Sequence, residues 1–136
     1  MSAAPQSASS QEQNKHLTVR WFEEVWNQNR GETISELLTA DSVIHDGQDD
    51  IRGIEGFRRF YDAIRAECTD IRITPLVSLA EDDLVCLHWA ADLRHMATSR
   101  TVHITGTSVT RIKHGHFLEA WQNWDQAGLA AQLADH

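Results

Sequence analysis

The hydrophobic period of the sequence changes once, near Cys68, and this change constrains the fold more than any other feature. Before it, apolar residues recur at spacings of three and four, as in amphipathic helices; after it, they alternate with polar residues, as in strands. Its 136 residues suffice for one domain. We therefore expect a disordered tail over 1–12 and a single α+β domain over 13–136, with N-terminal helices against a curved antiparallel sheet.

The helical half predicts three helices. The first follows a capping box of Ser10 and Gln13 and continues until Asn29 and Gly31 interrupt its apolar stripe. A short second helix is expected to be capped by Thr33. The third has an apolar face formed by Ile54, Phe57, Phe60, Tyr61 and Ile64.

The second half predicts strands joined by turns at 81–83 and 114–116 and by a polar connection at 95–100. Pro75 indicates a bulge or an edge strand, because proline cannot donate a hydrogen bond to a ladder. The strand before the connection has one apolar face, formed by Val85, Leu87, Trp89, Ala91 and Leu93. A curved sheet covered by helices is expected to enclose an apolar pocket.

Composition excludes several classes of partner. The net charge is −8 and the 12 Lys and Arg residues are scattered, which argues against nucleic acid and anionic membranes. Cys68 and Cys86 have no disulfide or zinc spacing, and we find neither a secretory signal nor a membrane span, so a cytoplasmic protein is expected. The only close histidine pair, His114 and His116, flanks a turn glycine, so no metal site is predicted.

Three segments carry a resemblance to a known family. They are Val43–Gly47 ahead of Gly53–Phe57, the strand Gly106–Ile112, and the terminal run Glu119–Leu129. Together they resemble the SnoaL-like polyketide cyclases of the NTF2-like superfamily, over most of the chain from about residue 13. The resemblance implies a cone-shaped α+β fold, usually a homodimer, which works without a cofactor on a hydrophobic carbonyl compound.

Asp125 is the residue that matches the acid/base aspartate of those cyclases, which catalyses an intramolecular aldol ring closure. It follows a strand that carries Trp121, Asn123 and Trp124. A carboxylate among indole rings loses solvation, which favours proton transfer, and we expect Asp125 to point into the pocket. The alternative is that Asp125 caps a C-terminal helix over 126–133.

Other residues are candidates for the same pocket. Asn123 shares the strand parity of Asp125, so its amide is expected to bind a substrate oxygen or to satisfy the backbone. His45 precedes the third helix and is a candidate catalytic donor or proton shuttle, with a structural role as the alternative. His103 and His88 are weaker candidates, because their facing depends on strand register. The aromatic candidates for substrate binding, or for the core, are Trp89, Trp121, Phe57 and Phe60.

The leading hypothesis is a cofactor-independent cyclase of the lyase or isomerase type. Asp125 would remove an acidic proton, the carbanion would attack a second carbonyl, and Asp125 would return the proton to the product oxygen. The alternatives are a dehydratase, isomerase or hydrolase of another hydrophobic molecule, or a non-catalytic ligand-binding or dimerisation domain. A homodimer is expected to bury an exposed sheet face that bears Val102, Ile104 and Ile112.

Overall fold

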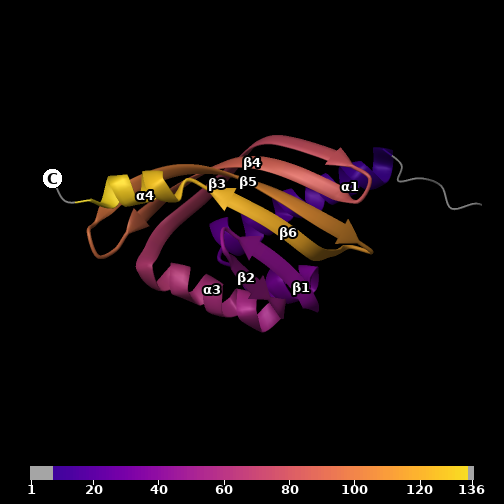
Figure 1. The fold of residues 1–136 in the computed structure, drawn as a ribbon, viewed down its shortest axis with the longest axis horizontal. Coiled ribbons are helices and arrows are strands. Elements are labelled where there is room, and N and C mark those ends of the chain that lie inside the picture. The colour runs from indigo at the N-terminus through magenta and orange to yellow at the C-terminus, as the bar shows by residue number, and fades with distance from the viewer. Residues whose placement is uncertain (1–7, 135–136) are drawn as a thin grey trace, which may run out of the picture.

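A single curved sheet forms the body of the protein in the computed structural model, which describes residues 8–134 (Figure 1). Within that range the strands have the spatial order β2-β1-β6-β5-β4-β3. They are β1 Leu38–Asp46, β2 Asp49–Arg52, β3 Cys68–Glu81, β4 Leu84–His95, β5 Arg100–Lys113 and β6 His116–Trp124. The α+β class is confirmed, and β3 to β6 form the expected antiparallel meander. The sequence did not reveal that β1 runs parallel to β6, which makes the sheet mixed.

The helices are α1 Ala8–Trp21, the π-helix η1 Phe22–Asn27, α2 Glu32–Leu37, α3 Gly53–Glu67 and α4 Gln126–Leu133. Because α1 already begins at Ala8, the capping box predicted at Ser10 is wrong. Residues 8–12 of the expected tail belong to α1, and 1–7 lie outside the described residues. Thr33 lies inside α2 and donates to Glu24 Oε1 at 2.7 Å, so it is not the predicted cap.

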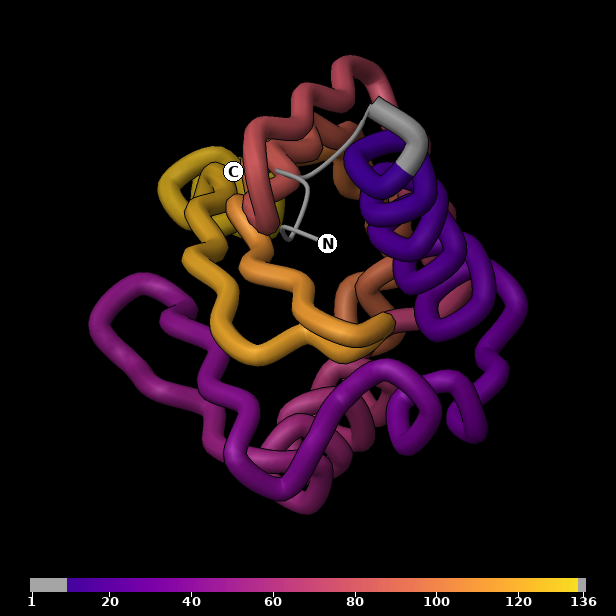
Figure 2. Tube along the Cα trace, turned by 90° about the vertical axis from the view of Figure 1, so that its right-hand side faces the viewer, coloured from indigo at the N-terminus to yellow at the C-terminus, as the bar shows by residue number. Residues whose placement is uncertain are grey.

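Helices α1 and α3 lie on one side of the curved sheet, as the view along its length shows (Figure 2). Helix α1 packs against β3 and β4, α3 packs mainly against β1 and β2, and α4 packs against β5. The side chains between these helices and the concave face form one continuous hydrophobic core. No helix within residues 8–134 is both long and apolar enough to cross a membrane.

Strand parity separates a concave inner face from a convex outer face. Val102, Ile104 and Ile112 are 0%, 7% and 1% exposed, so they belong to the inner face. The prediction that they form an exposed face is therefore wrong. Alternate residues of a strand point to opposite faces, and the alternation alone does not say which set the helices cover. The outer face instead carries Val77 and Leu79, which are 51% and 63% exposed.

The π-helix η1 is attached to the sheet by one side chain. The Asn27 amide accepts from Ile73 N at 2.6 Å and donates to Ile73 O at 2.9 Å, so it pairs with edge strand β3 as a neighbouring strand would. Tyr61 and Arg65 of α3 both donate to Val25 O, at 3.1 and 3.0 Å, and so satisfy a carbonyl at the end of η1. These contacts hold η1 in place, and from it Phe22 packs against Trp89 of β4 while Trp26 packs against Phe60 and Tyr61 of α3.

The proline prediction is also confirmed. Pro75 lies in β3, which is the edge strand next to β4, and the register shifts between Pro75 and Val77. The missing N–H donor therefore falls at an irregularity of an edge, where it disrupts little of the ladder.

Candidate functional site

An apolar pocket of about 160 Å³ lies between the helices and the concave face of the sheet. It is bounded by η1, α3 and α4 on one side and by strands β3 to β6 on the other. Two of the predicted binding residues, Trp89 and Phe60, line this pocket. Its other apolar walls include Trp26, Ile73, Ile104, Trp124 and Leu129.

Trp89 owes its position to a glycine. A Cβ atom at Gly106, its partner in the β4–β5 register, would overlap the Trp89 ring, so only glycine lets the indole lie flat against β5. The indole Nε1 donates to Ser108 Oγ at 3.1 Å. The ring is therefore held at both ends, as a rigid wall of the apolar pocket.

Few polar groups line the apolar pocket within the described part of the chain. They belong to Glu67, Cys68, His95 and Gln122. Burial raises the pKa of the Cys68 thiol, with a smaller contribution from the charge of Glu67. A raised pKa keeps the thiol protonated, so Cys68 serves as an apolar wall and is a poor nucleophile.

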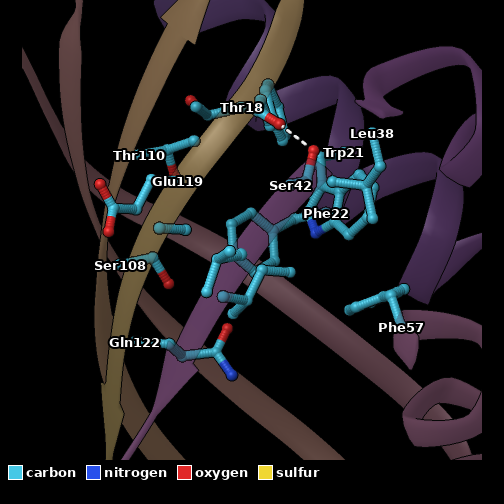
Figure 3. Close-up of a pocket in the computed structure, with 14 residues that line it drawn as sticks. Thr18, Trp21, Phe22, Leu38, Ser42, Phe57, Ser108, Thr110, Glu119 and Gln122 are labelled. Carbon is cyan, nitrogen blue, oxygen red and sulfur yellow. Dashed lines mark hydrogen bonds between the residues drawn. The ribbon is translucent and has the colours of Figure 1, made fainter. Parts of the chain in front are cut away.

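A second, inner cavity of about 30 Å³ adjoins the apolar pocket (Figure 3). Phe22 and Gln122 line both spaces and thus mark their junction. Phe57, a predicted binding residue, lines the inner cavity and not the apolar pocket. The inner cavity differs from the pocket in its buried hydroxyl groups, which belong to Thr18, Ser42, Ser108 and Thr110.

Asp46, which was not predicted, is a carboxylate that is hydrogen-bonded to the pocket wall. Its Oδ1 accepts hydrogen bonds from Gln122 Nε2 at 3.2 Å and from Trp124 Nε1 at 3.0 Å. It is half-buried at the end of β1 and opens on a surface groove between the β1–β2 turn and α4. That groove shares Trp124, Leu129 and Leu133 with the apolar pocket. Asp46 could have been identified from its position two residues after the apolar Ile44. Alternate residues of a strand point to the same face, so a buried Ile44 implies that Asp46 also points inward.

Asp125 does not point into the apolar pocket, so that prediction is wrong. It is exposed, and its Oδ1 accepts from Gly128 N at 2.9 Å as the N-cap of α4. The alternative, a helix cap, describes this contact. The chain leaves the sheet after Trp124, so the strand parity from which its direction was inferred no longer applies.

His45 lies on the outer face with Trp121. Its Nδ1 is 2.7 Å from Asp50 Oδ1, its Nε2 is 2.7 Å from Glu119 Oε2, and its ring stacks on Trp121 at 5.7 Å. The hydrogen bonds to Glu119 and then to Asp50 raise the pKa of the imidazole. The structure therefore brings two predicted site residues together, but neither lines the apolar pocket or the inner cavity.

The remaining predicted polar residues also face outward. Asn123 is exposed and pairs in register with Thr107. His103 is exposed with Nδ1 2.8 Å from Asp92 Oδ1, and His88 Nδ1 lies 3.0 Å from Gly106 O. Within residues 8–134 there is no group of three His, Cys, Asp or Glu side chains suited to a metal ion.

Several solved structures share this fold. A protein from Jannaschia sp. CCS1, provisionally named a SnoaL-like polyketide cyclase, matches with a TM-score of 0.84 at 16% identity, over 100% of this chain and 99% of that one. IdmH from Streptomyces antibioticus, provisionally named a polyketide cyclase, matches with a TM-score of 0.80 at 25% identity, over 89% and 98%. AclR from Streptomyces galilaeus, provisionally named a hydroxylase, matches with a TM-score of 0.78 at 17% identity, over 91% and 97%.

A search of curated proteins finds no match for the chain. The SnoaL-like domain profile, in contrast, matches residues 18–120, from α1 into β6. The matched span contains Asp46, Ser108 and most of the concave face, and it ends before Asp125. The chain therefore belongs to the SnoaL-like domain family.

Proposed function

We propose that the protein is a cofactor-independent enzyme of the polyketide cyclase type, which binds a hydrophobic carbonyl compound in the apolar pocket. One observation carries the proposal: a half-buried carboxylate, Asp46, is hydrogen-bonded to two residues of the pocket wall, Gln122 and Trp124. A mostly apolar pocket with a few convergent polar groups is the usual form of a small-molecule site. Membership of the SnoaL-like family and the fold shared with IdmH support the reaction class.

Asp46 is our candidate for the acid/base. Both of its hydrogen bonds end on Oδ1, so within the described residues Oδ2 has no donor and can accept a proton. It would take a proton from the carbon next to a substrate carbonyl, leaving an enolate. The enolate carbon would form a bond to a second carbonyl carbon, and Asp46 would return the proton to the resulting alkoxide. The reacting carbon would lie where the apolar pocket meets the groove, beside Trp124 and Leu129.

Asp125 remains the second candidate for the same role, on the resemblance of the terminal motif alone. His45 stays a proposal as a proton shuttle, although its position on the outer face separates it from the apolar pocket. The two aspartates differ in their side-chain contacts, because only the Asp46 carboxylate is hydrogen-bonded to residues that line the pocket.

The experiment measures deuterium uptake from D₂O into neutral hydrophobic ketones such as 1-tetralone, by mass spectrometry. Asp46→Asn is expected to lower the catalysed rate by roughly 10²- to 10⁴-fold, the usual cost of losing a general acid/base. Asp125→Asn and the control Asp62→Asn, at an exposed residue of α3, are expected to leave it unchanged. Undiminished exchange in a folded Asp46→Asn variant would remove Asp46 from the mechanism, and a loss in Asp125→Asn would assign the role to Asp125.

A second function, non-catalytic binding, is favoured by one observation. Neither Asp46 nor Asp125 is among the residues that line the apolar pocket itself. A ligand confined to that pocket would touch neither of these two candidate bases. Ligands that bind with no deuterium uptake in any ketone tested would support this function over catalysis.

We also propose that two copies associate through the outer face of the sheet. Val77 and Leu79 are more than half exposed there, and Val109 and Trp121 are only partly buried. Apolar side chains gathered on a sheet face are more stable against a second copy than in water. The pocket lies on the opposite, concave side, so association would leave it open.

A further inference from the structure

The amide of Gln122 has a fixed orientation. Its Nε2 donates to Asp46 Oδ1 at 3.2 Å, and because a carboxylate only accepts, the amide nitrogen must be the atom that faces it. Figure 3 shows the amide oxygen on the opposite side, directed toward Phe22. No donor within the described residues bonds to this oxygen. An unfilled acceptor thus stands at the junction of the apolar pocket and the inner cavity.

Two hydroxyl groups line the same cavity as this acceptor. Ser108 is the partner of Gln122 in the β5–β6 register, so the two side chains are neighbours on the inner face. Ser108 Oγ accepts from Trp89 Nε1, and within the described residues its own proton has no acceptor. Thr110 lines the same cavity with a hydroxyl that has no protein partner in that range. A ligand hydroxyl group can donate to the Gln122 oxygen and accept from a Ser108 or Thr110 hydroxyl at the same time.

The volume of the inner cavity and the charges around it restrict which ligand group can enter it. A space of about 30 Å³ holds a group the size of a water molecule or two, and not a ring. No Lys or Arg lines the apolar pocket or the inner cavity in the described part of the chain. The carboxylate of Glu119 points away from the inner cavity (Figure 3). It lies instead 2.7 Å from His45 Nε2 on the outer face. An anionic group buried here would lack a counter-charge, which is costly, so the ligand is neutral.

We propose that the site takes a neutral, mainly apolar molecule whose hydroxyl group enters the inner cavity, donates to Gln122 Oε1 and accepts from Ser108 or Thr110. The apolar body of the molecule packs against Trp89 and Phe60. Asp46 acts here as a positioning residue, because its hydrogen bond fixes the direction of the Gln122 amide. The inference rests on the proposed function only in using the same pocket, and it concerns which ligand is selected.

Equilibrium dialysis with three matched probes tests the selection. 2-Naphthol and 2-methylnaphthalene have nearly the same shape and differ in the hydroxyl group, whereas 2-naphthoate carries a charge. Wild-type protein is expected to bind 2-naphthol about three- to tenfold more tightly than 2-methylnaphthalene, the usual net effect of one hydrogen bond. 2-Naphthoate is expected to bind more weakly than either.

Two variants assign that preference to the inner cavity. Gln122→Met keeps the length of the side chain but removes the acceptor, so the affinity ratio of the two neutral probes should fall to about one. Thr110→Val removes a hydroxyl at constant shape and should lower the ratio in part. The control Phe60→Leu, which shortens an apolar wall, should weaken both probes and leave the ratio unchanged.

The Asp46→Asn variant tests the positioning role. Its amide can donate as well as accept, so Gln122 is free to turn its nitrogen toward the cavity. 2-Methoxynaphthalene, which can only accept, should then gain affinity relative to 2-naphthol by several-fold. A purely structural effect of this substitution would weaken both probes equally.

The outcomes separate this inference from the proposed function. Equal affinity of wild type for 2-naphthol and 2-methylnaphthalene would overturn the inference, as would a preference that persists in a folded Gln122→Met variant. With either result the apolar pocket would still be a binding site. The deuterium experiment would still test the proposed function on its own. Failure of every probe to bind would overturn both proposals.

Discussion

His45 and Glu119 are diagonal neighbours across the parallel β1–β6 pair, with imidazole Nε2 2.7 Å from carboxylate Oε2. Asp50 of β2 holds the other ring nitrogen at 2.7 Å. One imidazole therefore connects three strands, and it ties the short β1–β2 hairpin to the rest of the sheet. Because a protonated ring can donate to both carboxylates, the connection is strongest when His45 carries its proton.

This arrangement predicts a pH-dependent stability. The pKa of His45 is raised above its ordinary 6.5 in the folded state, so its stabilising contribution is complete below pH 6.5 and is lost as the pH rises through the raised value. Melting temperatures of wild type should fall over that window, and His45→Gln should flatten the curve. The control His16→Gln alters an exposed residue of α1 and should keep the wild-type slope. Parallel curves for wild type and His45→Gln would contradict the prediction.

Substitution of two glycines by alanine should change the free energy of unfolding in opposite directions. At Gly106 a Cβ would overlap the Trp89 ring, so Gly106→Ala should displace the indole from Ser108 and lower the free energy of unfolding by about 1–3 kcal/mol. Gly56 lies within α3 with its nearest contact at 3.8 Å, so Gly56→Ala should raise it by about 0.5–1 kcal/mol. Urea denaturation measures both changes. Equal stability of the two variants would show that Trp89 is not held against β5.

The cap of α4 predicts a coupled pair of substitutions. Asp125→Asn should be nearly neutral for stability, whereas Asp125→Ala should cost about 0.5–2 kcal/mol, because asparagine caps and alanine does not. A Cβ at Gly128 would overlap the Asp125 carboxylate, so Gly128→Ala should break the same hydrogen bond. Thermal melts of a double-mutant cycle should then show less than additive losses. Strict additivity would mean that the two residues do not interact.

Association through the outer face predicts a sedimentation mass of twice 15.4 kDa. The double variant Val77→Lys with Leu79→Lys should shift it toward the monomer, because two charges would be buried without partners. Met96→Lys changes a residue that is 45% exposed in the β4–β5 turn, away from that face, and serves as the control. A wild-type mass of 15.4 kDa at every concentration would reject the dimer.

Local features of the fold were predictable from the sequence. The change of period near Cys68 located the start of the long strands β3 to β6, although β1 and β2 lie before it, and Pro75 indicated an irregular edge strand. These features depend on residues that are close in sequence, where period and backbone chemistry decide the structure. The class of the domain follows from their order.

Long-range pairing was not predictable from those periods. No local pattern shows that β1 pairs in parallel with β6, and only this pairing places Asp46 beside Gln122 while it turns His45 outward. The direction of Asp125 was predicted wrongly for a related reason. The strand ends one residue before it, and its carboxylate caps the N-terminus of α4. A candidate site assembled from five strands, β1 and β3 to β6, depends on register, which sequence alone leaves open.

Helix α4 closes one end of the apolar pocket with Leu129 and Leu133, and the Gln132 amide binds His103 N and O at 2.9 and 2.7 Å. Any group fused behind α4 therefore follows directly on a helix that forms part of the pocket wall. A purification tag belongs before α1, whose first turn lies at the far end of the sheet (Figure 1). An environment-sensitive fluorophore at Ala134 would turn the same proximity into a direct optical signal of ligand entry.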